Sequence, residues 1–396
     1  MSKVRARPKA ALRADGEAAS WEPPWERRKR TTIRFFGLTR TTGRQMPRAR
    51  SRAHAGWAGP LLTHSLTTTC HDRGVGDDAT GRTPTLDRVY QNHHLDSKRW
   101  ASFQRRPGDI VISTAYKAGT TWTQRIVSLL IFGPDPLPSD LMTLSPWIDA
   151  RWSGPEEITN QTLAGQAHRR FVKSHLPLDA IPYWYDVRYI AVGRDSRDVF
   201  MSVLNHWSSY TDLMYQLLAA GDPVGGPLPR CPAHPRVAWV EWITTGSFPW
   251  EDDGSPWWSH HYHVNSFWQY RHLPNILLVH YADMKADLDG EMRRIAAFLG
   301  IDIDESNWPA LVQRATFESM KREAQAGTET MALWFEGGSD RFFFKGTNGR
   351  WRDVLTAEDL ALYETAVARL EPGLRRWLEV GRLAAPDLVP SPVSGL

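Results

Sequence analysis

Cysteine is scarce in this chain of 396 residues, which holds only Cys70 and Cys231. The two lie far apart in the sequence, so the chain has neither the framework of a disulfide-stabilised secreted domain nor the spacing of a cysteine-ligated metal site. Because free thiols persist in reducing compartments, we expect a cytoplasmic protein.

Long apolar segments are also absent. No run of about 18 apolar residues occurs, so we predict no membrane span. A secretory signal peptide is not expected either, because no apolar segment follows the basic residues near the N-terminus. A composition of 41% hydrophobic and 23% charged residues is instead typical of a globular protein.

Basic residues are unevenly distributed. The chain has 48 Lys and Arg residues and 44 Asp and Glu residues. Residues 1–70 contain 15 of the basic and 4 of the acidic residues. The remainder contains 33 basic and 40 acidic residues and therefore has a net charge of −7. The overall charge of +4 therefore comes from the front of the chain. A mildly acidic main body argues against nucleic acid as a partner.

The front of the chain, residues 1–86, is rich in Arg, Pro, Gly and small residues and has no clear periodicity. Such a segment buries too little apolar surface to offset its ordering entropy, so we predict a basic, disordered extension. The alternatives are an upstream stretch that an internal start at Met46 would skip, an organelle transit peptide, and a nuclear signal at Arg27–Arg30.

From residue 87 onward, short apolar segments alternate with segments of helical periodicity. This pattern is typical of a parallel sheet covered on both faces. We predict an α/β fold, a central parallel sheet flanked by helices, in one domain over residues 87–380, with a tail over 381–396. The expected strands are Asp109 to Ala115, Arg170 to His175, Val187 to Arg194 and Asn275 to Met284, with helices from near Thr121, over Asp195 to Trp207 and over Gly290 to Gly300.

The stretch "YKAGTTW", Tyr116 to Trp122, joins the first strand to its helix. A glycine lets an anion approach the backbone, and the first turn of a helix offers unpaired N–H groups at the positive end of its dipole. A lysine and two threonine hydroxyls add further donors. The stretch predicts a phosphate or sulfate site, although an ordinary strand–turn–helix corner with a surface lysine is the alternative reading.

The Gly-Lys-Ser/Thr ending of NTP-hydrolysing P-loops is missing from this stretch. Trp122 follows the two threonines and cannot ligate Mg²⁺, and the third strand ends in Arg194 rather than in an acid. We therefore predict an anion site that works without a metal. Because ligands of such sheets bind beyond the carboxyl ends of the strands, Lys117, His175 and Arg194 should meet at one edge.

Six segments in a fixed order resemble motifs of the cytosolic-type sulfotransferases, which use 3′-phosphoadenosine 5′-phosphosulfate (PAPS). The resemblance covers roughly residues 87 to 370. It implies a P-loop-containing sulfotransferase-like fold and transfer of a sulfuryl group from PAPS to a hydroxyl or amine by in-line displacement, with no metal. The segments are "YKAGTTW", "KSHLP" at Lys173–Pro177, "VGRDSRDVFMS" at Val192–Ser202, "YADMKAD", "ATFESMK" and "FFFKGTNGRWRDVLT" at Phe342–Thr356.

The resemblance implies a role for each matched residue. His175 would be the general base, and a neutral imidazole near its usual pKa of about 6.5 suits proton abstraction at neutral pH. Lys117 and Lys173 would stabilise the charge that develops on the bridging oxygen. The residues that would bind PAPS are Lys117, Ala118, Gly119, Thr120 and Thr121 at the 5′-phosphosulfate, Arg194, Ser202, Lys345 and Gly346 at the 3′-phosphate, Trp122 and Phe317 at the adenine, and Met320 at a part of the cofactor that the resemblance leaves unspecified. Core packing is the alternative for Trp122 and Phe317.

Several positions depart from the family pattern. Phe344 stands where the family has an arginine that contacts phosphate, and Arg341 or Arg350 could supply the missing charge. The other departures are Tyr116 and Ala118 for a proline and a serine, and His261 or Tyr262 at a family tyrosine.

The acceptor is expected to contact a Trp- and Pro-rich segment, residues 228–258. Aromatic walls with few charges suit a small aromatic or apolar hydroxyl compound. A homodimer is possible by analogy with the family.

Two other classes of function fit the same loop. One is a metal-dependent P-loop kinase, which would need Mg²⁺ where a sulfotransferase would not. The second is a non-catalytic protein that binds PAP, the desulfated carrier, and the loss of the family arginine at Phe344 makes it conceivable. Replacing His175 by alanine separates this second class from a sulfotransferase, because in the enzyme binding should survive while turnover is lost.

Overall fold

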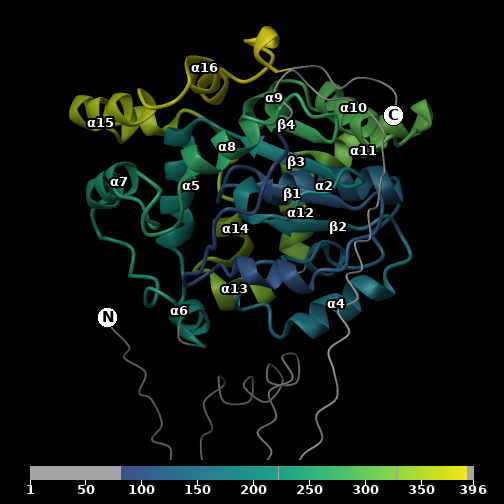
Figure 1. Ribbon diagram of the computed structural model, residues 1–396, viewed down its shortest axis with the longest axis horizontal. Helices are drawn as coiled ribbons and strands as arrows, with labels where there is room; N and C mark the ends of the chain where they lie inside the picture. The colour runs from purple at the N-terminus through teal and green to yellow at the C-terminus, as the bar shows by residue number, and fades with distance from the viewer. Residues whose placement is uncertain (1–81, 222, 327–328, 390–396) are drawn as a thin grey trace, which may run out of the picture. The chain divides into compact units, whose positions relative to one another are not determined.

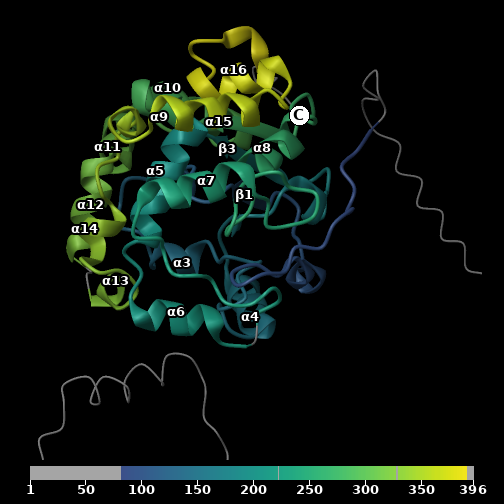
Figure 2. The same cartoon turned by 90° about the vertical axis from the view of Figure 1, so that its left-hand side faces the viewer.

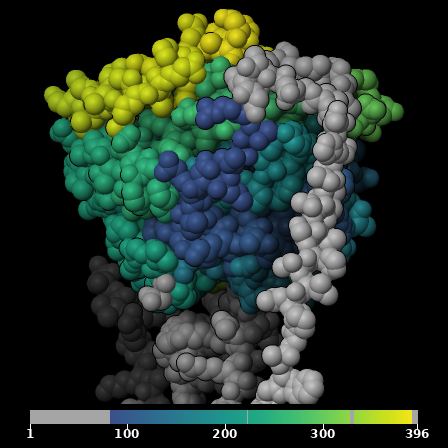
Figure 3. All heavy atoms as spheres, viewed as in Figure 1, coloured from purple at the N-terminus to yellow at the C-terminus, as the bar shows by residue number. Residues whose placement is uncertain are grey.

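The computed structural model describes residues 82–221, 223–326 and 329–389. These residues belong to one unit spanning residues 76–396. The prediction of a disordered extension over residues 1–86 lies almost entirely outside the described residues, as do the last seven residues of the predicted tail. Figure 3 shows the first described residues, in purple, lying on the surface.

Four parallel strands form the central sheet, in the order β2-β1-β3-β4. The strands lie within the four segments expected from the sequence, and helices flank the sheet (Figure 1), which confirms the predicted fold class. The expected fourth strand is too long, because it ends at His280, whose Nδ1 accepts a hydrogen bond from the backbone N–H of Ala282 and caps a helix. The strands are β1 Ile110–Thr114, β2 Phe171–Ser174, β3 Arg188–Gly193 and β4 Ile276–His280.

Alternate residues of each strand face two separate hydrophobic cores, as the two-residue period of a strand requires. Ile110 and Ile112 pack against one set of helices, whereas Val111 packs against the other. The helices in the first core are α2 Thr120–Phe132, α10 Leu288–Leu299 and α11 Trp308–Ala315, and those in the second include α5 Ser196–Trp207, α7 Pro235–Thr244, α8 His260–Trp268, α15 Ala357–Val367 and α16 Pro372–Val380.

The three short helices between residues 317 and 342 lie along the left edge of the view in Figure 2. No helix of the described residues combines the length and the apolarity needed to cross a bilayer. The remaining elements are η1 Ser97–Ser102, α3 Leu141–Leu144, α4 Glu156–Gly165, η2 Leu178–Ala180, α6 Asp212–Ala219, α9 Tyr281–Ala286, η3 Glu305–Asn307, α12 Phe317–Ala326, α13 Glu329–Trp334, α14 Gly338–Phe342, η4 Arg350–Asp353 and η5 Pro386–Leu388.

The C-terminal helix packs directly on the end of β3. A Cβ at Gly193 would lie 2.3 Å from the ring of Trp377 in α16, so only glycine allows this approach. Within the predicted tail, Arg382 donates its backbone N–H to Asp283 and its guanidinium to Glu291, so the chain past α16 also contacts the domain.

Candidate active site

The loop between β1 and α2 holds the backbone in an unusual conformation. Lys117 has a φ of +65° and Gly119 a φ of +130°, and a Cβ at Gly119 would lie 3.1 Å from the ring of Tyr281. The hydroxyls of Thr114 and Thr120 share a hydrogen bond that ties the strand end to the first helical residue. Gly119 at the N-cap makes no side-chain hydrogen bond to α2, which leaves the first N–H groups of the helix without a capping side chain, the feature on which the predicted anion site depends.

His175 follows β2 directly and is only 2% exposed. Its Nδ1 lies 2.7 Å from the carbonyl oxygen of Thr114, which can only accept, so Nδ1 carries the proton and Nε2 carries the lone pair. Burial and the charge of Lys173 lower the pKa of His175 well below the ordinary value, so the ring is neutral at physiological pH rather than half-charged. Three rings surround it, those of Tyr116, Trp147 and Trp258.

Lys173 lies two residues before His175 in β2, on the same face. Its Nζ is 4.1 Å from the centroid of Trp147, a cation–π contact. Burial lowers the pKa of Lys173 to about 8, and the charge of Asp149 opposes this shift. Asp149 accepts hydrogen bonds from the backbone N–H of His175 at 3.2 Å and from Nε1 of Trp147 at 2.8 Å, so one carboxylate orients both neighbours of the lysine.

Lys117 reaches a histidine that the sequence did not single out. Its Nζ lies 3.2 Å from Nδ1 of His206 in α5 and 4.6 Å from the centroid of Phe342. Burial lowers the pKa of Lys117 to about 7, with further lowering by the charges of Lys173 and Arg194. Lys117 therefore lies close enough to Lys173 and to Arg194 to be repelled by both, which is the electrostatic character of a site for a polyanion.

Arg194 follows β3 and is nearly buried. Its guanidinium donates to the carbonyl oxygen of Lys117 at 3.3 Å and to Oδ1 of Asn348 at 2.9 Å, whereas its buried Nε has no partner among the described residues. The backbone N–H of Gly349 donates to Asp198 at 2.7 Å. The C-terminal loop is thus attached to the start of α5 beside Arg194.

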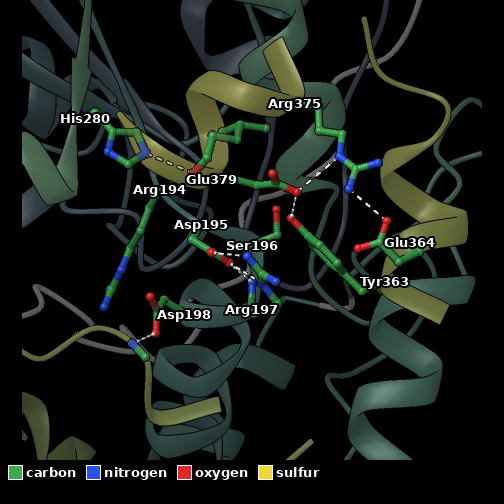
Figure 4. A network of polar contacts seen from close by, with 12 residues as sticks. Arg194, Asp195, Ser196, Arg197, Asp198, His280, Tyr363, Glu364, Arg375 and Glu379 are labelled. Carbon is green, nitrogen blue, oxygen red and sulfur yellow. Dashed lines mark hydrogen bonds and ion pairs between the residues drawn. The ribbon is translucent and has the colours of Figure 1, made fainter. Parts of the chain in front are cut away.

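Side chains of the C-terminal helices α15 and α16 also contact the turn that carries Arg194 (Figure 4). The guanidinium of Arg197 binds Asp195 at 2.6 Å and lies 4.3 Å from the centroid of Tyr363 in α15. The hydroxyl of Tyr363 donates to Glu379 in α16 at 3.1 Å. These contacts fix the backbone that follows Arg194.

A buried hydrogen-bond chain links α8 to the same turn. Nε2 of His261 lies 2.7 Å from the hydroxyl of Ser196, and its Nδ1 lies 2.7 Å from Oδ2 of Asp253. Burial would raise the pKa of Asp253, but His261 holds it below the ordinary value. Tyr262 instead donates to Asp179, so His261 is the residue that reaches α5 from the position of the family tyrosine.

Phe344 stands where the family has an arginine, and two arginines, Arg341 and Arg350, could supply the missing charge near Ser202. Ser202 lies two turns into α5, and Nη2 of Arg350 donates to the backbone carbonyl of the preceding residue at 3.2 Å. Three cations lie 5.3 Å from the ring centroid of Phe344: Arg341, Lys345 and Arg350. Of the two arginines considered from sequence, Arg350 is the one beside Ser202.

The residues expected at the adenine form a second group. Nε1 of Trp122 donates to the carbonyl oxygen of Ala315 at 2.7 Å, two residues before Phe317. A Cβ at Gly346, where φ is +60°, would lie 2.8 Å from the ring of Phe317. Phe317 therefore packs against Gly346, Trp122 binds the chain two residues before Phe317, and Met320 lies one turn later in α12 with its side chain buried.

Sequence reasoning missed three residues that contact the lysines and the base: Trp147, Asp149 and His206. His206 could have been found, because it lies four residues after Ser202 and therefore on the same face of α5. Trp147 and Asp149 precede β2 by more than twenty residues, and no motif marks them. In the described part of the chain, no cluster of three or more His, Cys, Asp or Glu side chains could hold a metal ion.

Comparison with known proteins places the chain in a family. Residues 107–370 match the model of the sulfotransferase domain. The chain is 38% identical over 330 residues to a glycolipid sulfotransferase of Mycobacterium bovis and 36% identical over 329 residues to one of Mycobacterium tuberculosis, in each case over 76% of this chain and 96% of the relative. It is 28% identical to mouse sulfotransferase 1B1 over 66% of this chain and 82% of that protein.

Solved structures share the fold. Mouse sulfotransferase SULT7A1, complexed with PAP, superposes with a TM-score of 0.54 at 20% identity, over 72% of this chain and 93% of that one. Retinol dehydratase, in a complex with retinol and PAP, gives a TM-score of 0.52 at 23% identity, over 68% and 83%. The chain therefore belongs to the sulfotransferase family and is itself a sulfotransferase.

Proposed function

We propose that this sulfotransferase uses PAPS as its donor and transfers the sulfuryl group to an acceptor hydroxyl, with His175 as the general base. One observation carries the proposal. The proton on Nδ1 of His175 is committed to the carbonyl oxygen of Thr114, so Nε2 is left as a lone pair beside Lys173. A neutral imidazole with a free lone pair and a fixed tautomer is the state in which a histidine can abstract a proton.

The residues around the β1–α2 loop fit the two phosphate groups of PAPS. Lys117, the first turn of α2 and Lys173 would hold the 5′-phosphosulfate, and Arg194, Ser202 and Arg350 the 3′-phosphate. Support comes from two buried guanidinium nitrogens, Nε of Arg194 and Nε of Arg350, that have no partner among the described residues. Binding of a polyanion offsets the repulsion between cations that lie close together in the free protein, so such cations favour binding strongly.

Each catalytic side chain has one task in the transfer. PAPS supplies an activated sulfuryl group, whose bond to the phosphate oxygen breaks as the acceptor oxygen bonds to sulfur. Nε2 of His175 takes the proton that the acceptor hydroxyl loses. Lys117 and Lys173 stabilise the negative charge left on the departing phosphate oxygen.

We propose a glycolipid as the acceptor. The two mycobacterial relatives named above are glycolipid sulfotransferases. The aromatic rings around His175 also suit a sugar, because the C–H face of a sugar ring is apolar and packs on Trp and Tyr. A simple phenol, favoured by the same rings, is the second candidate.

The proposal is tested by sulfuryl transfer from ³⁵S-labelled PAPS to a panel of glycolipids and phenols, with PAP binding measured by calorimetry. His175→Ala should lower kcat by about 10²- to 10⁴-fold, the usual contribution of a general base, and leave PAP affinity nearly unchanged. His168→Ala serves as the control, because His168 precedes β2 at the opposite end of the strand. Unchanged turnover in His175→Ala would refute the assignment.

The two other classes of function are separated in the same assay. Transfer should persist in excess EDTA, whereas a P-loop kinase would lose activity with its Mg²⁺. A protein that binds PAP without catalysis would show calorimetric binding but no labelled product with any acceptor.

A further inference from the structure

A second histidine lies among the rings that surround His175. The ring centroid of His94 lies 5.8 Å from that of Tyr116, 6.5 Å from that of Trp147 and 6.1 Å from that of Trp258. The ring of His175 lies 5.3, 4.7 and 5.7 Å from the same three. The two histidines therefore share one set of aromatic neighbours.

Hydrogen bonds fix the tautomer of His94. Nε2 of His93 lies 2.7 Å from the carbonyl oxygen of Pro256 and must donate to it, so Nδ1 of His93 is a lone pair. Nδ1 of His94, 2.5 Å away, therefore carries a proton that it donates to His93. A neutral His94 is then left with its lone pair on Nε2.

Both rings are neutral at physiological pH. Burial lowers the pKa of His93 to about 4, and burial together with His93 lowers the pKa of His94 well below the ordinary value. His94 is completely buried, and its Nε2 has no hydrogen-bond partner among the described residues. An unsatisfied buried acceptor is costly, so its presence beside the base points to a ligand that completes it.

Two unsatisfied donors lie in the same aromatic group. Nε1 of Trp257 and Nε1 of Trp258 are buried and have no partner in the described part of the chain. The ring of Trp257 lies 4.9 Å from that of His94, and the ring of Trp258 lies 6.1 Å from that of His94 and 5.7 Å from that of His175. One acceptor and two donors set among aromatic faces match a ring with several hydroxyls better than a phenol with one.

We propose that Nε2 of His94 accepts a hydrogen bond from a second hydroxyl of the acceptor, next to the hydroxyl that His175 deprotonates. This role rests on the proposed function. It makes His94 a specificity-determining residue that selects polyhydroxylated acceptors, such as the sugar of a glycolipid, over acceptors with one hydroxyl.

The test compares two acceptors with the same alkyl chain. Octyl β-D-glucopyranoside offers several hydroxyls, and octan-1-ol offers one. Transfer of ³⁵S from labelled PAPS to each gives kcat and KM separately. The wild type should have the higher kcat/KM with the glucoside.

Three replacements of His94 separate hydrogen bonding from packing. His94→Phe keeps a ring without nitrogens. His94→Asn keeps a polar atom near Nδ1, and His94→Gln can place an oxygen near Nε2. Loss of one buried hydrogen bond should raise KM for the glucoside about tenfold in the Phe and Asn variants and change KM for octanol less than about twofold, whereas Gln should stay near the wild type. If His94→Phe does not fold, the difference in KM for the glucoside between His94→Asn and His94→Gln still tests whether a hydrogen bond at Nε2 is used.

Equal losses with both acceptors, or no loss with the glucoside, would overturn the role of His94 while leaving the enzyme intact. A wild type that does not prefer the glucoside would overturn it too. A wild type that binds PAP yet transfers to neither acceptor would contradict the proposed function itself.

Discussion

Nζ of Lys117 lies 3.2 Å from Nδ1 of His206, and Nε2 of the same ring lies 2.8 Å from the hydroxyl of Tyr116. That hydroxyl is in turn 2.8 Å from the hydroxyl of Tyr210. The acceptor lone pair of His206 faces the lysine, so its other nitrogen donates to Tyr116. The loop lysine is thus held by a side chain of α5, the helix that also presents Ser202.

Replacing His206 by phenylalanine should weaken this hold on Lys117. The aromatic contacts with Tyr210 and Phe335 would be kept, but the acceptor for the ammonium would be lost. Because hydrogen bonds to charged groups contribute about 1.5–3 kcal/mol, we expect kcat/KM to fall by about 10- to 100-fold. Steady-state kinetics measure the loss, and Tyr210→Phe, which removes only the far end of the chain, should cost much less. Equal effects of the two variants would contradict this view.

The lowered pKa of Lys117, about 7, predicts pH-dependent binding of PAP. Above pH 7 the free protein holds the neutral amine, and an anion prefers the ammonium, so binding must take up a proton. PAP affinity should therefore fall as pH rises from 7 to 9, by up to about tenfold per pH unit. Calorimetry in two buffers of different ionisation enthalpy measures the proton uptake.

Lys117→Arg provides the control for this titration, because a guanidinium stays charged throughout the range. The variant should take up fewer protons than the wild type and show a shallower profile between pH 7 and pH 9, and the remaining slope would come from Lys173, whose pKa is about 8. A flat profile in the wild type would show that Lys117 is already charged in the free protein.

Arg350 contacts the backbone beside Ser202, so we predict that Arg350, and not Arg341, supplies the charge of the family arginine that Phe344 replaces. Arg350→Ala should weaken PAP binding by about tenfold or more, as expected for a lost charge-assisted contact with phosphate. Arg341→Ala, which removes an equal charge at the same 5.3 Å distance from Phe344, should have the smaller effect. Calorimetric titration with PAP ranks the two, and the reverse order would exclude Arg350 from the 3′-phosphate site.

Gly346→Ala should weaken PAP binding in addition to straining the backbone. The added Cβ would lie 2.8 Å from the ring of Phe317, so the C-terminal loop or the ring must move. Gly300→Ala is a matched control, because Gly300 has a φ of +63° against +60° but has nothing within 4 Å of an added Cβ. Both variants should lose about 1 kcal/mol of unfolding free energy.

Only Gly346→Ala should also weaken PAP binding, by several-fold in calorimetry. The same loss in Gly300→Ala would mean that the effect comes from global stability and not from Phe317.

The sheet and its carboxyl edge were predictable because both depend on local sequence. Apolar runs mark the strands, and the residues that directly follow β1, β2 and β3 must meet at one edge. The end of β4 was not predictable from hydropathy, because the helix that starts at Tyr281 depends on a cap from His280.

The aromatic surroundings of His175 were not predictable in the same way. Trp258 lies within the segment 228–258 that was expected to contact the acceptor, but its place beside His175 was not indicated, Trp147 reaches the base from a segment that carries no motif, and so does His94. Their roles depend on packing between distant segments and on buried hydrogen bonds that select a tautomer. Hydropathy and spacing carry no information about either.

The attachment of the C-terminal loop to α5 has a consequence for synthesis on the ribosome. Asn348 and Gly349 bind Arg194 and Asp198 across separations of 154 and 151 residues. The strands and α5 are synthesised before these partners, so the growing chain lacks both contacts, and with them the complete proposed PAPS site, until residues 348 and 349 have been added. A nonsense mutation between His280 and Asn348 would keep all four strands of the sheet but remove both partners that hold Arg194 and Asp198.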